Sequence, residues 1–268
     1  LVRWRLAQLS SHIVVALIAL LVVGGATRVM EAGLACPDWP LCFGTFLPGR
    51  QMNIQVFLEW FHRLDAFLVG IALLVQFVVA IIYRSKLPRW LIFSYGALLF
   101  LVSMQGALGA LTVLRLLPSL IVTAHLLLAL TLISLMSALS QRLLEPDHSS
   151  SPLWWRLMGA GSLLTVIFQC LLGGRMATTW SSSRCLIQGQ SCQLLYLHRI
   201  FSILPTFLIV VFVLTALALG GWTRNQWPFL GSILILVAIQ IALGVYSVHL
   251  GLSQPLITIS HQLVAALL

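Results

Sequence analysis

Charged side chains are scarce in this sequence, and their scarcity limits what the chain can be. Only 8% of its 268 residues are charged, whereas 60% are hydrophobic, and the mean hydropathy is +1.04. Soluble domains carry roughly a quarter charged residues, so this chain lacks the polar surface that a protein surrounded by water needs. A membrane span takes about 20 apolar residues, so the length leaves room for seven or eight spanning helices. The composition therefore predicts an all-α integral membrane protein with lipid around its helices.

Acidic residues are rarer still, with six Asp and Glu against 15 Lys and Arg, which gives a formal net charge of +9. The basic residues stand singly at the ends of apolar runs instead of forming a patch. They therefore indicate membrane topology and not nucleic-acid binding. Only Glu59 and Asp65 lie within a predicted span. A proton relay needs a chain of acids and bases across the bilayer, so the sequence argues against one.

Eight apolar runs are the predicted membrane spans. They cover residues 12–30, 59–83, 91–114, 119–143, 154–176, 196–220, 227–249 and 256 onward. The sequence opens at Leu1 without a methionine and stops at Leu268 inside the last run, so we expect it to be trimmed at both ends. The eighth helix is accordingly expected to be truncated.

The distribution of Lys and Arg predicts the orientation of the chain. Most of the Lys and Arg residues lie in loops on one side of the membrane. The loops on the other side carry fewer Arg residues, and their charge is partly offset by Glu31 and Asp38. The positive-inside rule then places the N-terminus in the cytoplasm and the loops at 31–58 and 177–195 outside. We expect a multi-pass protein of the cell membrane, or of the inner membrane in an organelle. The residues on the cytoplasmic side are Arg3, Arg5, Arg84, Lys86, Arg89, Arg142, Arg156 and Arg224.

Cysteine is also sparse, and four of the five cysteines fall in the two predicted outer loops. Disulfides persist in that oxidising compartment, so we expect one short disulfide in each loop, Cys36–Cys42 and Cys185–Cys192. A four-cysteine zinc site is the alternative, although the spacing is not the usual C-x2-C. Neither pair forms C-x-x-C-H, which excludes covalent c-type heme attachment. Cys170, in the middle of a span, is interpreted as a packing residue.

The chain contains an internal repeat. Phe61-His62-Arg63 matches Leu197-His198-Arg199, Gln105 to Gly109 matches Gln240 to Gly244, and His125 matches His261, at separations of 136, 135 and 136 residues. Gly24-Gly25 likewise matches Gly173-Gly174, each before a two-cysteine loop. Four spans separate the copies, so both enter the membrane in the same direction. The sequence predicts two parallel four-helix bundles, residues 1–145 and 146–268.

Four histidines repeat as two pairs, His62 with His125 and His198 with His261, from the second and fourth helices of each half. Ionisable residues within membrane spans are costly and usually functional. Two imidazoles at matched depth on facing helices can bind a planar metal cofactor from both sides, and axial ligation of heme iron is the obvious use. A zinc site would need more ligands than two histidines supply. The remaining histidines, His12, His148 and His249, are given no role in a site.

Glu59 distinguishes the two halves. It precedes His62 by three residues, whereas Leu195 stands at the equivalent position before His198, and Phe201 is the counterpart of Asp65. Residues three apart share a helix face, so Glu59 is expected to face the same cofactor edge as His62 and to work as an acid–base group. The alternative is that Glu59 marks the helix start, where the helix dipole favours acids.

These residues resemble a known family. Glu59-Trp60-Phe61-His62-Arg63 is similar to the E-x-x-H-R motif of the heme A synthases. The resemblance covers essentially the whole chain, and it extends to the eight-helix duplicated layout. The other matching residues are Cys36, Cys42, His125, His198, Arg199 and His261.

The resemblance implies an enzyme that oxidises a methyl group of heme O to the formyl group of heme A, the cofactor of terminal oxidases, by successive hydroxylations. His62 and His125 would bind the substrate heme, and His198 and His261 would hold a resident heme b. Glu59 would act beside the substrate as a proton acceptor or as the positioner of a water. Heme O synthase or oxidase assembly factors would be partners.

Two other functions fit part of the pattern. A bis-histidine cytochrome b that only transfers electrons would explain the paired histidines, but it gives no role to Glu59. Electron transfer across a bilayer also favours hemes near both membrane surfaces, whereas all four histidines are expected near the outer one. A transporter would explain the parallel repeats, and Pro205 could break a helix at mid-membrane. Its first-half counterpart, however, is Val69.

Overall fold

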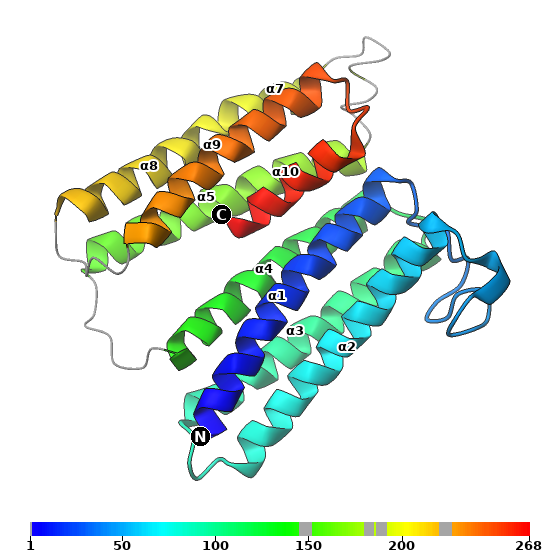
Figure 1. Cartoon of the computed structure of the whole chain (residues 1–268), viewed down its shortest axis with the longest axis horizontal. Coiled ribbons are helices and arrows are strands. Elements are labelled where there is room, and N and C mark those ends of the chain that lie inside the picture. The colour runs from blue at the N-terminus through cyan, green and yellow to red at the C-terminus, as the bar shows by residue number, and fades with distance from the viewer. Residues whose placement is uncertain (1, 145–151, 180–184, 186–191, 220–226) are drawn as a thin grey trace. The chain divides into compact units, whose positions relative to one another are not determined.

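The computed structural model describes residues 2–144, 152–179, 185, 192–219 and 227–268. The described chain is helical apart from its loops, with no strand beyond an isolated bridge between Cys42 and Thr45 (Figure 1). The prediction of an all-α protein is therefore confirmed. The helices are α1 (Val2–Val29), α2 (Ile54–Ile82), α3 (Arg89–Leu114), α4 (Ser119–Leu144), α5 (Leu153–Thr178), α7 (Gln193–Phe201), α8 (Ile203–Ala218), α9 (Trp227–His249) and α10 (Pro255–Leu267), with a short 3-10 helix at Gly49–Gln51.

Seven helical segments in the described part of the chain are long and apolar enough to cross a membrane. They are α1 to α5, the segment Gln193–Ala218 that combines α7 and α8, and α9. The predicted eighth span corresponds to α10, which has 13 residues. The prediction of a multi-pass membrane protein is confirmed.

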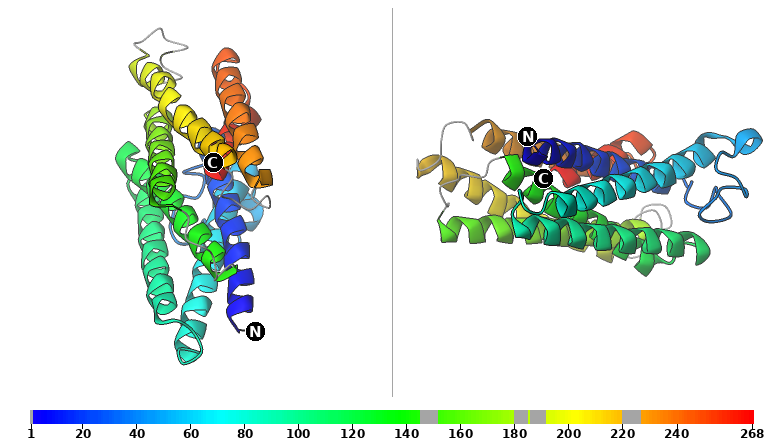
Figure 2. Two further views of the ribbon diagram at one scale, coloured as in Figure 1. Left: turned by 90° about the vertical axis from the view of Figure 1, so that its left-hand side faces the viewer. Right: turned by 90° about the horizontal axis from the view of Figure 1, so that it is seen from below.

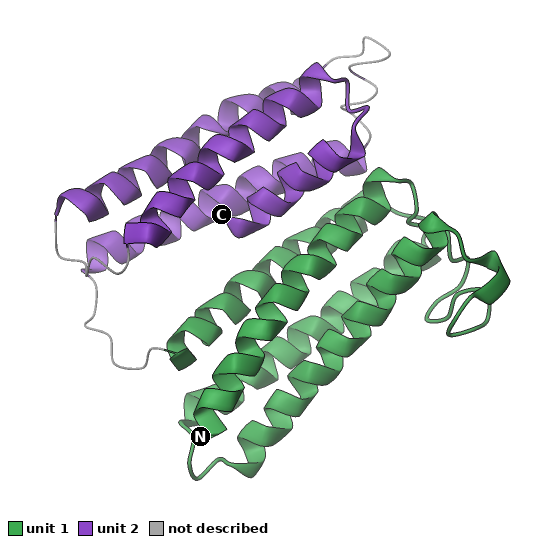
Figure 3. Cartoon of the chain, viewed as in Figure 1, with its two compact units in different colours: residues 1–148 green, residues 149–268 purple. Residues whose placement is uncertain are grey.

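The chain divides into two compact units, residues 1–148 and 149–268 (Figure 3). In unit 1, α1 packs against α2 and α4, and α3 packs against the same two helices. The four helices run side by side (Figure 2). Each packs against two neighbours, so the bundle is closed and α2 and α4 lie diagonally across from each other. This order brings the second and fourth helices to face the bundle interior from opposite sides.

Unit 2 repeats the contacts between successive helices and has no counterpart of comparable extent to the packing of α1 against α4. Helix α5 packs against α7 and α8, α8 against α9, and α9 against α10. The sequence predicted one continuous span over residues 196–220, but the structure interrupts it at Ser202, between α7 and α8. Pro205 is the physical reason, because its ring clashes with the carbonyl group of Phe201 four residues earlier and it has no N–H to donate. The equivalent Val69 leaves α2 continuous.

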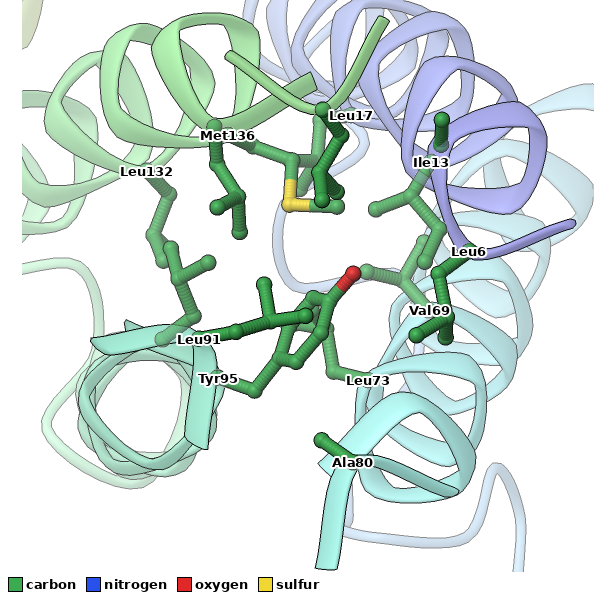
Figure 4. Packing of buried hydrophobic residues seen from close by; sticks show 14 of the residues in the cluster. Leu6, Ile13, Leu17, Val69, Leu73, Ala80, Leu91, Tyr95, Leu132 and Met136 are labelled. Carbon is green, nitrogen blue, oxygen red and sulfur yellow. The ribbon is translucent and has the colours of Figure 1, made fainter. Parts of the chain in front are cut away.

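The buried core of unit 1 lies at one end of the bundle. Its members come from residues 6–17 of α1, 69–80 of α2, 91–98 of α3 and 132–143 of α4, together with Leu87 just before α3 (Figure 4). A polar cluster is buried inside it, where the Gln76 amide donates to Ser10 Oγ at 2.9 Å and Ser10 Oγ lies 3.1 Å from the Tyr95 hydroxyl. On every helix the core stops short of the histidine pair, which lies nearer the other end.

Candidate functional site

The first predicted histidine pair comes together inside unit 1. His62 lies in the third turn of α2 and His125 in the second turn of α4, close to the end of the bundle that carries the 30–53 loop. Their ring centres are 6.5 Å apart and the ring planes are inclined by 67°. Both rings are half-buried.

The second pair has nearly the same geometry in unit 2. His198 lies in the second turn of α7 and His261 in the second turn of α10. Their ring centres are 6.4 Å apart and the ring planes are inclined by 72°. The repeat in the sequence therefore corresponds to a repeated arrangement of imidazoles.

This spacing fits two imidazoles on opposite sides of one metal ion. Two metal–nitrogen bonds of about 2 Å each, with roughly 1 Å more from each nitrogen to its ring centre, give a separation of roughly 6 Å. Within the described ranges no group of three or more His, Cys, Asp or Glu side chains comes together. The donor set is thus a pair of histidines per unit, which suits a metal whose remaining ligands belong to a planar macrocycle such as heme.

Each histidine ring packs against a helix glycine where no side chain could fit without displacing the ring. A Cβ atom at Gly24 would lie 2.9 Å from Cε1 of His62, and the equivalent distance from Gly244 to His261 is 3.0 Å. The other two contacts are Gly109 with His125 at 3.3 Å and Gly173 with His198 at 3.1 Å. The matched glycines therefore let the helix backbone approach each ring closely and fix its position.

The histidine rings also carry buried polar atoms. Nδ1 of His62, His125 and His261 is buried and makes no hydrogen bond to any other described residue. The backbones of Leu20, Gln105 and Gln240 lie against these rings. A metal-ligating histidine usually turns its second ring nitrogen to a backbone carbonyl in this way, which leaves Nε2 for the metal. Heme fits the residues present in both units.

Glutamines contact three of the four histidines, and the sequence analysis gave them no role. The Gln105 amide donates to the His125 carbonyl oxygen at 3.0 Å, and the Gln169 amide donates to that of His198 at 2.6 Å. Nε2 of Gln240 lies 3.4 Å from Nε2 of His261. We call the glycine that packs against each histidine ring its cradle glycine. Each glutamine precedes the cradle glycine of its own helix by four residues, and this common spacing could have identified Gln169 from the sequence.

Glu59 is buried at the outer end of α2, with 4% of its surface exposed. Its Oε2 accepts a hydrogen bond from the backbone N–H of Cys36 at 2.8 Å, and its Oε1 forms an ion pair with Arg63. The carboxylate therefore joins the outer loop to the helix that carries His62. The sequence did not predict this anchoring contact, and the acid–base role of Glu59 stays a prediction.

Arg63 organises the outer loop around this carboxylate. Besides Glu59, its guanidinium donates to the carbonyl oxygens of Asp38, at 2.6 Å, and Leu41, at 2.5 Å. The Asp38 carboxylate in turn accepts from the backbone N–H groups of Phe43 and Gly44, at 2.7 and 2.8 Å. One arginine thus holds two turns of the loop against α2.

Both predicted cysteine pairs are disulfides in the structure. The Cα–Cα distances are 4.8 Å for Cys36–Cys42 and 5.2 Å for Cys185–Cys192, within the usual range. Cys36 and Cys42 are fully buried beside Val56, which lies one turn before Glu59 on α2.

The corresponding region of unit 2 is simpler. Leu195 occupies the position of Glu59 and is buried, and Arg199 is exposed. His62 follows Gly24 by 38 residues, whereas His198 follows Gly173 by 25. The 13 additional residues of the first half include part of the loop that packs on Glu59.

The other residues singled out in the sequence take no part in the contacts described above. Asp65 is half-buried on α2, and His249 is exposed at the end of α9. Nδ1 of His12 lies 2.7 Å from the Gln8 carbonyl oxygen, and Cys170 is a half-buried free thiol. The sequence positions His148, Arg184 and Arg224 fall outside the described residues.

Comparisons with known proteins agree with this arrangement. A family model described as Cytochrome oxidase assembly protein matches residues 7–268. A heme A synthase of Shewanella oneidensis is 29% identical over 191 residues, which cover 62% of this chain and 54% of that protein. One of Bradyrhizobium diazoefficiens is 30% identical over 227 residues, which cover 67% and 60%. One of Sphingopyxis alaskensis is 27% identical over 330 aligned positions, which cover 100% and 88%.

The chain thus spans between about half and three-fifths of the length of the first two of these relatives. The family model, in contrast, extends over nearly all of the chain, including all four histidines, Glu59 and both cysteine pairs. The resemblance to heme A synthases that the sequence predicted is confirmed, and the chain belongs to the cytochrome oxidase assembly protein family.

Proposed function

We propose that this protein is a heme A synthase, which oxidises a methyl group of heme O to the formyl group of heme A for terminal oxidases. The observation that carries the proposal is the pair of like histidine sites, at 6.5 and 6.4 Å, of which only one has a carboxylate beside it. Such asymmetry suits one site that reacts and one that holds a cofactor.

In this proposal His62 and His125 bind the substrate heme in unit 1, and His198 and His261 bind a resident heme b in unit 2. The bound heme b would supply one-electron chemistry to the reaction. Gly24, Gly109, Gly173 and Gly244 let each ring lie flush against its neighbouring helix. The rings are thereby oriented before a heme binds, which reduces the ordering cost of ligation.

Glu59 is the acid–base candidate of unit 1. It lies one turn from His62, and the buried environment strengthens any interaction it makes with a reacting group. Arg63 and the Cys36 N–H hold the carboxylate at a defined place at the outer end of α2. From there it would accept a proton released during oxidation or position a water for the same purpose.

The second candidate function is a bis-histidine cytochrome b that transfers electrons without altering its heme. The equal spacing of the two pairs favours it. It gives no role to the buried Glu59–Arg63 ion pair or to the longer outer loop of unit 1. The relatives compared above are also heme A synthases. Partners consistent with the proposed function are lipid, a heme O synthase and oxidase assembly factors.

Chromatography of acid-extracted hemes tests the two candidates directly. The full chain is expressed in membranes that contain heme O, and the extract is compared with that of membranes without the chain. Heme A, or its hydroxylated precursor, is expected. If folded protein accumulates with heme b alone and heme O stays unconverted, the cytochrome becomes the better account.

The residue assignments have their own expected outcomes. Glu59→Gln keeps an oxygen for the Cys36 N–H but loses the charge, so heme A formation should fall by about a hundredfold or more while the resident heme spectrum is retained. His198→Ala should instead remove the resident low-spin heme. Wild-type heme A formation in Glu59→Gln would contradict the acid–base role, and unaltered heme content in His198→Ala would contradict the ligand assignment.

A further inference from the structure

All four histidine sites are built from the same three positions on two adjacent helices. A residue on the first helix precedes the cradle glycine by one turn, and the histidine projects from the next helix against that glycine. The four sets are Leu20, Gly24 and His62; Gln105, Gly109 and His125; Gln169, Gly173 and His198; and Gln240, Gly244 and His261.

In three sets the first position is a glutamine whose amide contacts the histidine residue across the helix pair. Gln105 and Gln169 donate to the backbone carbonyl of the histidine itself, so they hold the helix at the point where the ligand projects. A hydrogen bond between helices is effective there because the surroundings are apolar.

The fourth set departs from this pattern. Leu20 has an aliphatic side chain and cannot donate a hydrogen bond to His62. It occupies the equivalent place, because it lies one turn before Gly24 and its backbone lies against the His62 ring, as the backbones of Gln105, Gln169 and Gln240 lie against theirs. The four sets therefore differ in the side chain at this position and not in the backbone contact. Among the described residues, His62 is therefore the one histidine of the four that no glutamine amide contacts.

The outer end of α2 is held from the loop side instead. Glu59, one turn before His62, accepts from the Cys36 N–H, and Arg63, directly after His62, donates to the carbonyl oxygens of Asp38 and Leu41. These contacts belong to the loop at 30–53, whereas the glutamine contacts of the other sets lie between neighbouring helices of a bundle.

We propose that Leu20 makes His62 the releasable ligand of the four, so that unit 1 exchanges its heme while unit 2 retains the one it holds. The inference rests on the proposed function, in which unit 1 must accept a substrate heme and discharge a product. His125, anchored by Gln105, keeps its position while His62 lets go of the iron.

The test measures heme release in the full chain. In a His261→Ala background only unit 1 keeps both ligands, so the purified protein is loaded with hemin and mixed with excess apomyoglobin. Leu20→Gln supplies the missing amide and should slow heme transfer roughly threefold to tenfold, the effect of one net hydrogen bond. Leu20→Met, which matches the size without an amide, is the control and should release heme at the rate of the background.

The reciprocal change is made in unit 2. In a His62→Ala background, Gln169→Leu should accelerate heme transfer from unit 2 by a similar factor. Equal release rates for Leu20→Gln and Leu20→Met, with helicity and the low-spin spectrum intact, would overturn the proposal. If Leu20→Gln does not fold, the comparison of Gln169→Leu with its His62→Ala background decides alone. An unchanged heme-transfer rate in Gln169→Leu would then overturn the proposal.

These outcomes are separable from the proposed activity. The probe is hemin, and no oxidation of heme O enters the measurement. If membranes yield no heme A but Leu20→Gln still slows release, the enzymatic proposal fails and the assignment of His62 as the releasable ligand stands. If heme A forms but the release rates do not change, only the role of Leu20 is lost.

Discussion

At the scale of single residues, the contact between each histidine and its glycine decides whether a ring can be a ligand. Gly244→Val would place a Cβ atom 3.0 Å from Cε1 of His261 and add two methyl groups beyond it. The His261 ring must then leave its place opposite His198, and changes of this kind next to a metal ligand typically weaken binding by about tenfold to a hundredfold. We expect the variant to lose most of its resident heme, measured as heme per protein after purification.

Gly231→Val is the matched control for this prediction. Gly231 lies on the same helix, α9, and a Cβ atom there meets nothing within 4 Å. It introduces the same side chain with the same helix propensity, so its heme content should equal that of the wild type. Equal heme content in Gly244→Val and Gly231→Val would show that the glycine contact does not position His261.

The sequence predicted that the four histidines form two ligand pairs, but it did not predict which residues contact their rings. Histidines in apolar runs are conspicuous, and their repeat at 136 residues identified the pairs. The glycine contacts depend on which helices are neighbours, and a run of apolar residues carries no information on that. Gln169 escaped notice because its first-half counterpart is Leu20, so the comparison of the two halves gave no match there.

At the scale of elements, the outer loop and α2 form one unit through Arg63. Its guanidinium reaches Glu59, Asp38 and Leu41, and the disulfide beside them is fully buried. Arg63→Leu removes these contacts and leaves a buried carboxylate without its ion pair, which typically costs about 3–5 kcal/mol. Local opening of the loop should become more frequent, so a membrane-impermeant reductant should reduce Cys36–Cys42 at least roughly tenfold faster. The rate is followed by alkylation of the released thiols.

Arg50→Leu provides the control within the same loop. Arg50 lies in the short 3-10 helix and is exposed, so its removal should leave the reduction rate unchanged. Arg63→Lys should fall between the wild type and Arg63→Leu, because an ammonium group cannot serve three acceptors in the planar geometry of a guanidinium. Equal rates in Arg63→Leu and Arg50→Leu would disprove the organising role of Arg63.

The helical elements were largely predictable, since the apolar runs reproduce most spans. Two differences have physical causes. Helix α1 begins at Val2 instead of residue 12, because residues such as Arg3 and Arg5 continue the helix beyond its apolar part. The sixth span is divided at Ser202 because Pro205 breaks the hydrogen-bond pattern. The bond between Glu59 and the Cys36 N–H was not predictable, because no periodic pattern reports how an irregular loop folds back.

At the scale of the whole molecule, duplication gives two bundles that share the geometry of the histidine pair and differ in the residues around it. Unit 1 has the acid, the longer loop and a leucine beside its ligand, and unit 2 has a leucine in place of the acid and a glutamine beside its ligand. Each difference alone is a single substitution or insertion. Together they place the acid, the longer outer loop and the histidine without a glutamine contact in unit 1. The proposed function expects these features in the half whose heme is exchanged.

The orientation of the molecule decides from which side heme reaches these sites. In each unit the histidines lie near the end that carries the disulfide loop, and the strongly basic segment with Arg84, Lys86 and Arg89 lies at the opposite end of α2. The positive-inside rule predicts that this basic end faces the cytoplasm.

Alkaline phosphatase fused after Leu47 should therefore be active, and green fluorescent protein fused after Lys86 should fluoresce. The exchanged fusions serve as controls and should both be silent. The reverse pattern would place the His62–His125 pair near the cytoplasmic surface, and heme would then have to enter and leave unit 1 from the reducing side of the membrane.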